Sequence, residues 1–193
     1  KDKNWGTRES AAIALGRLGE PAEVHVPILI KLLKDKSVIV RESTAKAIGK
    51  MGETAAIFVP SLAKLLKDNN SNVRISAVES LGKMGASTMS HIPALVKLLK
   101  DDNPSVRGYA AEALGRMGEL AASHVPALIE SLKDKNASVR ESVVKAIGVM
   151  GETAGIHAPA LVKLLRDKNW SVRESAAKVI AQMGESAASH TPF

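Results

Sequence analysis

Apolar residues form two helical patterns that alternate along the chain. In the first pattern, Leu161, Leu164 and Leu165 lie at positions i, i+3 and i+4, which places their side chains on one face of an α-helix. The second pattern consists of Val172, Ala176, Ala177, Ile180 and Met183. No segment alternates apolar and polar residues as a β-strand does. The sequence therefore predicts pairs of helices and no sheet.

Polar residues between the two patterns indicate where the second helix of each pair begins. Pro104 follows Asn103, as expected of a proline at the first helical position. Ser138 with Glu141 has the spacing of a capping box and offers an alternative start about two residues later. The favoured N-caps form one column of Asn or Ser, which contains Asn4, Ser37, Asn70, Asn103, Asn136 and Asn169.

Glycine occupies two columns, for which we expect different roles. A glycine after a helix is the favoured C′ residue, and this column contains Gly19, Gly52, Gly85, Gly118, Gly151 and Gly184. The other column lies three residues earlier, inside the helix, and contains Gly16, Gly49, Gly82, Gly115 and Gly148. Ala181 fills this inner column in the last copy. A small residue is therefore what the position needs, and the column predicts close approach of two helices.

Both patterns repeat with a period of 33 residues, marked by Pro27, Pro60, Pro93, Pro126, Pro159 and Pro192. A fixed period of this length indicates stacked supersecondary units. We expect a single array over residues 1–193, made of a half repeat (1–19), five full repeats (20–52, 53–85, 86–118, 119–151 and 152–184) and the start of a truncated repeat (185–193). Because both ends fall inside a repeat, we expect a fragment of a longer protein, with end-to-end or dimeric self-association through the truncated ends.

An Asp followed six positions later by an Arg recurs in every copy. The pairs are Asp2 and Arg8, Asp35 and Arg41, Asp68 and Arg74, Asp101 and Arg107, Asp134 and Arg140, and Asp167 and Arg173. Together with the proline and the apolar positions, this pattern resembles the HEAT repeat over essentially the whole chain. The period is close to that of the short bacterial repeats related to bilin lyase subunits. Ankyrin repeats share the period, but their Thr-Pro-Leu-His motif is absent.

The resemblance implies an all-α fold, a right-handed α-solenoid of stacked antiparallel helix pairs with about 11 helices. It also implies that the first helices form the convex side and the second helices line a concave groove. The Asp and Arg columns would then form a ladder of hydrogen bonds and ion pairs between neighbouring repeats.

Composition limits the classes of function. Aromatic residues make up 3% of the chain and hydrophobic residues 45%, so the core must consist of Ala, Leu, Ile, Val and Met. The sequence has no cysteine, which excludes disulfides, thiolate metal sites and cysteine nucleophiles. No apolar run is long enough to cross a membrane, and residues 1–10 lack the apolar stretch of a signal peptide. We expect a soluble, cytoplasmic protein without a membrane partner.

Catalytic or metal-binding residues do not stand out from the repeat. One column contains His25, His91, His124, His157 and His190. Packed helices lie about 8–10 Å apart, too far for one metal ion to be shared between copies. Phe58 occupies the same column, which favours a packing position. No nucleophile with a base, phosphate-binding glycine loop or carboxylate pair breaks the repetition. We expect no catalytic residue, metal or cofactor, and no enzymatic activity.

The positive net charge raises the question of nucleic-acid binding. The formal charge is +7 and the pI is about 9.7. The repeated basic run on the second helices, Arg17, Lys50, Lys83 and Arg116, is interrupted by Val149 and Gln182. Acidic residues alternate with it, whereas phosphate binding favours an uninterrupted basic stripe. A nucleic-acid-binding module therefore remains an alternative rather than the preferred interpretation.

Positions at which the copies differ are the best candidates for a binding site. Tyr109 is the only tyrosine, it replaces a serine found in the other copies, and tyrosine is enriched in binding hot spots. Trp5 and Trp170 share a column and are interpreted as partly exposed packing residues, with Trp170 a weaker interface candidate. The candidate site consists of Tyr109, Ile75, Glu79, Lys83, Glu112, Arg116, Lys50, Lys145 and Val149.

These patterns favour a non-catalytic scaffold or protein- or peptide-binding module that uses the concave face. Besides the nucleic-acid-binding module, the repeat length leaves open a regulatory or lyase-type subunit of an enzyme complex.

Overall fold

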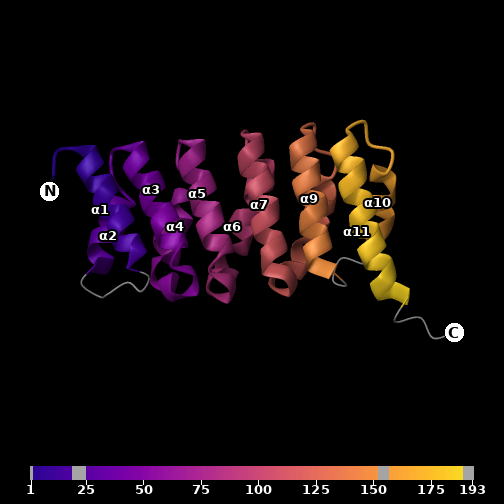
Figure 1. Ribbon diagram of the computed structural model, residues 1–193, viewed down its shortest axis with the longest axis horizontal. Coiled ribbons are helices and arrows are strands. Elements are labelled where there is room, and N and C mark those ends of the chain that lie inside the picture. The colour runs from indigo at the N-terminus through magenta and orange to yellow at the C-terminus, as the bar shows by residue number, and fades with distance from the viewer. Residues whose placement is uncertain (1, 19–24, 152–156, 189–193) are drawn as a thin grey trace. The chain divides into compact units, whose positions relative to one another are not determined.

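The computed structural model describes residues 2–18, 25–151 and 157–188, with side chains up to Gly184. Every regular element among these residues is a helix, which confirms the all-α prediction. The chain divides into two compact units, here called unit 1 (Lys1–Ala94) and unit 2 (Leu95–Phe193). Figure 1 shows the helices of both units, coloured by their position in the chain.

Unit 1 is built around three long second helices that pack one after another. These are α1 (Trp5–Arg17), α3 (Val38–Gly49) and α5 (Ser71–Gly82). The shorter first helices are α2 (Val26–Leu32), which packs on α1 and α3, and α4 (Val59–Leu65), which packs on α5. Two 3-10 helices connect the repeats, η2 (Gly52–Phe58) and η3 (Gly85–His91). Helix α6 (Ile92–Lys97) spans the boundary between the units.

Unit 2 repeats this arrangement. Its second helices are α7 (Pro104–Met117), α9 (Ala137–Met150) and α11 (Trp170–Ala188), and α9 packs against both of the others. Helices α8 (Val125–Ser131) and α10 (Ala158–Leu164) pack on α9 and α11 respectively. The 3-10 segments are η4 (Leu98–Lys100) and η5 (Gly118–His124).

Apolar packing of the first helices supplies much of the core. The same leucine in each of them is fully buried, at Leu29, Leu62, Leu95, Leu128 and Leu161. A fully buried leucine contributes about 1.5–3 kcal/mol relative to an exposed one. This column therefore holds each first helix against its repeat.

The asparagine column caps the second helices as predicted. Asn103 Oδ1 accepts hydrogen bonds from the backbone amides of Ser105 at 2.8 Å and Val106 at 3.4 Å, and Pro104 is the first residue of α7. Ser37 is the N-cap of α3, but its hydroxyl makes no capping bond. The alternative capping-box start is wrong, because Asn136 caps α9 and this helix already begins at Ala137.

Glycines of the C′ column, which follows the second helices, turn the chain after four of these helices. Gly52, Gly85, Gly118 and Gly151 have φ between +51° and +62°, a region in which a side chain would be strained. Gly19 lies outside the described residues. Gly184 does not end its helix, because α11 continues to Ala188. After Gly52, Gly85 and Gly118 a 3-10 segment packs back on the preceding helix. The described residues contain no such segment after Gly184.

Glycines of the inner column allow close contact between second helices. A Cβ atom on Gly16 would lie 2.6 Å from Cβ of Ala47, and one on Gly115 would lie 2.7 Å from Cα of Ala146. Both distances are far below van der Waals contact. The prediction of close helix approach is therefore confirmed in both units.

The proline column marks the start of the first helices. Pro60 and Pro126 occupy the first turn of α4 and α8, where a missing amide hydrogen costs no helical hydrogen bond. The segments before them are the 3-10 helices η2 and η5. A helical path therefore begins before each of these prolines, and the proline stands in the first turn of the α-helix that follows.

Candidate interaction surface

Within each unit, an arginine of one second helix pairs with an aspartate in the turn before the next second helix. Arg8 donates through Nε and Nη2 to the two carboxylate oxygens of Asp35, at 2.6 and 2.8 Å. The same two-pronged geometry recurs in Arg41–Asp68, Arg107–Asp134 and Arg140–Asp167. The predicted ladder is therefore confirmed at these four rungs.

Each rung also fixes the turn before its second helix. Arg41 Nη1 donates to the backbone oxygens of Asp35 at 2.8 Å and Lys36 at 3.2 Å. Asp35 in turn accepts from the backbone amide of Ser37 at 2.8 Å. The hydrogen bond from Arg8 lowers the pKa of the Asp35 carboxyl. These charges are satisfied within the fold, so they are structural residues and poor candidates for a binding site.

For Asp68 and Asp134 two effects on the pKa compete. Burial disfavours the charged carboxylate and raises its pKa, whereas the hydrogen bonds from Arg41 and Arg107 lower it. The net direction is downward in both cases. Hydrogen bonding to the charged form therefore outweighs desolvation, and both groups are carboxylates at neutral pH.

Exposed Glu–Lys pairs line several second helices one turn apart. Lys145 Nζ lies 2.6 Å from Glu141 Oε1 on α9, and Lys178 Nζ lies 2.6 Å from Glu174 Oε1 on α11. Helix α7 departs from this pattern, because Gly108 takes the place of the first Glu. Its acidic residue comes one turn later and pairs with an arginine at 3.7 Å, in Glu112–Arg116.

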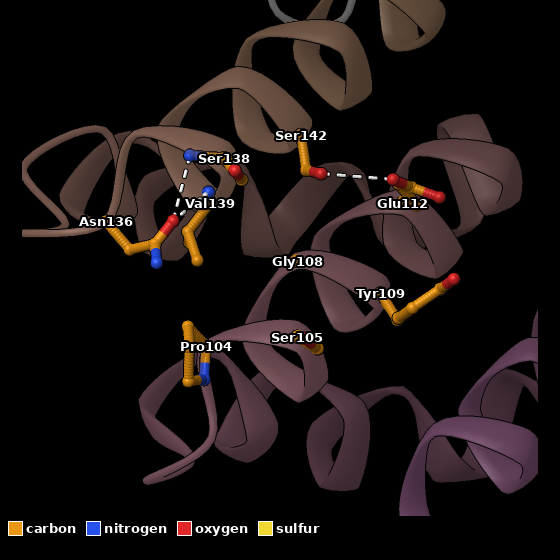
Figure 2. Close-up of a pocket in the computed structure, with 9 residues that line it drawn as sticks. All are labelled: Pro104, Ser105, Gly108, Tyr109, Glu112, Asn136, Ser138, Val139 and Ser142. Carbon is orange, nitrogen blue, oxygen red and sulfur yellow. Dashed lines mark hydrogen bonds between the residues drawn. The ribbon is translucent and has the colours of Figure 1, made fainter. Parts of the chain in front are cut away.

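A cleft of about 270 Å³ lies between α7 and α9 (Figure 2). The absence of a side chain on Gly108 leaves space beside Ser142, whose hydroxyl donates to Glu112 Oε1 at 3.0 Å. Tyr109 is half-buried, and its hydroxyl end points away from Pro104. The cleft is lined by Pro104, Ser105, Gly108, Tyr109, Glu112, Asn136, Ser138, Val139 and Ser142.

A second cleft, of about 450 Å³, lies between α9 and α11. Both Glu–Lys pairs border it, and Val149 is 69% exposed beside them. An apolar side chain next to weak surface ion pairs is a suitable contact for a partner. The cleft is lined by Glu141, Lys145, Gly148, Val149, Glu174, Ser175, Lys178, Val179 and Gln182.

The structure divides the predicted site residues between the two units. In unit 2, Tyr109 and Glu112 line the first cleft, Lys145 and Val149 line the second, and Arg116 is exposed on α7. The others lie in unit 1, where Ile75 and Glu79 are half-buried on α5 and where Lys83 and Lys50 are exposed C-caps of α5 and α3.

Several lining residues are absent from the candidate site predicted from the sequence. They include Gly108, Asn136, Ser138, Ser142, Glu141, Glu174, Lys178 and Gln182. Gly108 could have been predicted as a site residue from the sequence, because it is the one glycine in a column that otherwise holds Glu or Ile. The serines and Asn136 recur in other copies, so nothing in the sequence distinguished them.

The histidine and tryptophan columns lie outside the two clefts, and in the histidine column Nδ1 of His91 lies 2.8 Å from the hydroxyl oxygen of Ser90. Within residues 2–18, 25–151 and 157–188, no group of three or more His, Asp or Glu residues could hold a metal ion. Phe58 is fully buried in the histidine column, as expected of a packing position, and His190 lies outside the described residues. Trp5 is 49% and Trp170 66% exposed.

None of the described helices is long and apolar enough to cross a membrane.

Comparison with known proteins identifies the repeat. The family description "HEAT repeats" matches residues 1–59, 26–91, 92–158 and 125–190. A sequence comparison with curated proteins gives no match.

Solved structures share the fold. An engineered protein is similar at 20% identity, with a TM-score of 0.67 over 96% of this chain and 93% of that one. The complex of CpcE and CpcF of phycocyanin lyase from Nostoc sp. PCC7120 is similar at 25% identity, with a TM-score of 0.65 over 97% and 75%. Computationally designed armadillo repeat proteins for modular peptide recognition are similar at 22% identity, with a TM-score of 0.61 over 90% and 92%.

Proposed function

Because the chain belongs to the HEAT-repeat family, we propose that this helical repeat scaffold binds a protein or an extended peptide through the second-helix face of α7, α9 and α11. The resemblance described above makes this the concave face. The observation that carries the proposal is the pair of neighbouring clefts in unit 2, each lined in part by residues at which the copies differ, such as Tyr109 and Val149. Glu141 and Ser142, adjacent on α9, line one cleft each.

The chemistry of the two clefts suits a peptide with both charged and apolar side chains. Exposed ion pairs one helical turn apart contribute only about 0.3–0.5 kcal/mol, so Glu141 and Lys145 can exchange partners at small cost. Val149 offers apolar area that the fold itself leaves uncovered. Packed helices lie about 8–10 Å apart, and an extended chain advances about 10 Å in three residues. Every third residue of a bound peptide would therefore meet a new helix.

Structural neighbours support this use of the fold. The designed armadillo proteins are described as made for modular peptide recognition. At 22% identity the likeness concerns the fold alone, so the sequence preference of this chain must come from its own clefts.

A peptide selection tests the proposal. The 193-residue chain is used to select from a random 12-residue phage library, and affinities of selected peptides are measured by fluorescence polarisation. We expect Val149→Asp and Tyr109→Ala each to weaken binding about tenfold or more, the range of an interface anchor. Val162→Asp, the same change at an exposed position on first helix α10, is the matched control and should leave affinity unchanged. Equal affinity for all variants contradicts the proposed face.

Nucleic-acid binding is the second candidate, and the net charge of +7 is the observation in its favour. On α9 and α11, however, Lys145 and Lys178 are each paired with a glutamate, which leaves little unbalanced charge for phosphates. A titration of DNA and RNA binding against salt decides, because phosphate neutralisation requires a steep loss of affinity with salt. A flat response excludes this function.

A subunit of a lyase-type complex is the third candidate, supported by the likeness to the CpcE–CpcF complex. Co-expression with a bilin chromophore and an acceptor protein tests it. Absence of bound and transferred chromophore would remove this function and leave the peptide-binding proposal untouched.

A further inference from the structure

The cleft between α7 and α9 lies where one side chain of the repeat is missing. Three repeats earlier, Glu9 of α1 stands at this position, and its Oε1 accepts a hydrogen bond from the hydroxyl of Ser43 on α3 at 2.7 Å. The equivalent residues of α7 and α9 are Gly108 and Ser142. Because Gly108 has no side chain, the space beside Ser142 is open. The cleft therefore suits a single inserted side chain.

The carboxylate of Glu112 is held on the wall of this cleft. Ser142 donates its hydroxyl to Glu112 Oε1 at 3.0 Å, so the serine that meets a glutamate at the first position in α1 meets one a helical turn later in α7 (Figure 2). The column of Glu112 holds a lysine in α3, α9 and α11, at Lys46, Lys145 and Lys178. Helix α7 thus presents a negative charge where these helices present a positive one.

The second oxygen of this carboxylate has no close donor. Oε2 of Glu112 lies 3.7 Å from Nη2 of Arg116, which is longer than a hydrogen bond. The other cations of α7 and α9 are engaged elsewhere, Arg107 and Arg140 in the ladder and Lys145 in an ion pair on its own helix. An incoming cation can therefore form a short, charge-assisted hydrogen bond with Oε2 that the described residues do not supply.

The rest of the cleft wall is uncharged. Hydroxyl groups of Ser105, Ser138 and Tyr109 line it, and among the described residues no lysine or arginine does. The ring of Tyr109, next to Gly108 in the sequence, offers a surface for methylene groups and for a cation above its face. The cleft is therefore electronegative, with an aromatic contact beside its single carboxylate.

The cleft between α9 and α11 differs in charge. It is lined by two glutamates and two lysines, which pair at 2.6 Å as Glu141–Lys145 and Glu174–Lys178. Its negative charges are already matched by the fold. Of the two clefts, the one between α7 and α9 is the one that favours a positively charged side chain.

We propose that the α7–α9 cleft binds one lysine or arginine side chain of the peptide partner. The cationic end would donate to Glu112 Oε2, while the methylene stem lies over Gly108 and against Tyr109. Arg116 gives way at small cost, because an exposed ion pair at this distance is weak. This inference rests on the proposed function and adds to it the chemistry of one residue of the peptide.

Parallel selections from the random 12-residue library test the proposal. We expect peptides selected by the wild-type chain to share a lysine or arginine at one position. Peptides selected by Glu112→Gln, which keeps the shape of the side chain and removes its charge, should lack this preference.

Fluorescence polarisation then measures the contribution of the charge. One selected peptide is compared with the same peptide in which norleucine replaces the shared lysine, or citrulline the shared arginine. We expect the wild-type chain to bind the uncharged peptide about tenfold more weakly, the usual effect of losing a hydrogen bond to a charged group. Glu112→Gln should bind the two peptides with equal affinity, because the partner of the charge is gone.

Gly108→Ile tests the space independently of the charge. Isoleucine already stands at this repeat position in α5, as Ile75. A Cβ atom at Gly108 would lie 3.3 Å from the Ser142 hydroxyl, which can rotate away. We expect this variant to fold, as checked by a thermal melt, and to bind the selected peptide about tenfold more weakly. Glu112→Gln remains informative if Gly108→Ile is unstable.

Glu130→Gln is the matched control. It makes the same change of charge on an exposed residue of α8 that lines neither cleft. We expect it to keep both the preference for a cationic residue and the difference in affinity between the two peptides.

Three outcomes overturn the proposal. Selected peptides without a shared lysine or arginine do so, as does selection of an acidic residue, which would show that the cleft is filled in the way Glu9 fills its own position. A difference between the charged and uncharged peptides that persists in Glu112→Gln places the cation elsewhere. Val149→Asp, measured in the same series, separates the two proposals. If it weakens binding in any of these cases, the proposed face stands and only the cationic subsite fails.

Discussion

Gly115 and Gly184 show that the same residue type has opposite roles at different positions. A Cβ atom on Gly115 would lie 2.7 Å from the backbone of Ala146, whereas one on Gly184 would meet nothing within 4 Å. We expect Gly115→Ala to destabilise the protein by about 1–3 kcal/mol, the usual cost of overpacking. Gly184→Ala should leave stability unchanged or raise it by up to about 1 kcal/mol, because alanine favours the helix. Urea unfolding of both variants measures this contrast, and equal destabilisation would contradict the packing described for α7 and α9.

Arg140 and Arg173 provide a second comparison between equivalent residues. The Arg140 side chain is nearly buried and pairs with Asp167, whereas among the described residues Arg173 makes only its backbone bonds. We expect Arg140→Met to destabilise the chain by about 3 kcal/mol, because it leaves a largely buried carboxylate unpaired. Arg173→Met should cost clearly less. The difference between their free energies of unfolding checks this, and similar losses would show that the rung itself contributes little.

At the scale of elements, the ladder predicts a dependence of stability on pH. Hydrogen-bonded arginines lower the pKa of Asp35, Asp68, Asp134 and Asp167 in the folded state. Because the folded pKa lies below the unfolded value of about 3.9, the unfolded chain binds protons first as the pH falls. The stabilisation is therefore complete above that value and is lost as the pH falls through the folded pKa.

Urea midpoints measured from pH 7 down to pH 2 test this dependence. We expect a decline that begins near about pH 4. Asp167→Asn removes one of the titrating rungs and should make the decline shallower, while lowering stability at pH 7. A profile of unchanged steepness would mean that other carboxylates cause the acid transition.

The helix boundaries show which features of an element local sequence patterns can predict. The Asn column placed the starts of α7 and α9 correctly because a cap is a local interaction between Asn103 or Asn136 and the next two or three amides. The end of α11 was placed wrongly at Gly184, because a glycine permits a turn but does not force one. At Gly52, Gly85 and Gly118 the packing of the following 3-10 segment decides the turn.

At the scale of the whole molecule, repeats are coupled mainly to their neighbours. Leu128 on α8 is fully buried, so Leu128→Ala should cost about 2–5 kcal/mol. We expect hydrogen exchange to accelerate most in α8 and α9 of unit 2 and least in α1 and α3 of unit 1. Uniform acceleration along the chain would show that the array unfolds as a single cooperative body.

The candidate site was only partly accessible from the sequence. Tyr109 and Val149 were found because they break the repeat, and both line clefts in unit 2. Ile75 also breaks its column but lies in unit 1. Glu79, Lys50 and Lys83 were grouped with these residues by repeat position, and they lie in unit 1 as well. Repeat position identifies the face of a helix but not which helices share a cleft, since a cleft depends on neighbouring side chains such as the missing one at Gly108.

The sequence by itself determined the helical repeat, its period, its caps and its arginine–aspartate ladder. Each of these follows from interactions that are local or recur at a fixed spacing, so one copy repeats the information in the next. Tertiary structure alone decided that Tyr109 and Val149 border two different clefts, and that α11 continues past Gly184. These features depend on which neighbour covers each face, and a repeated motif carries no record of its neighbour.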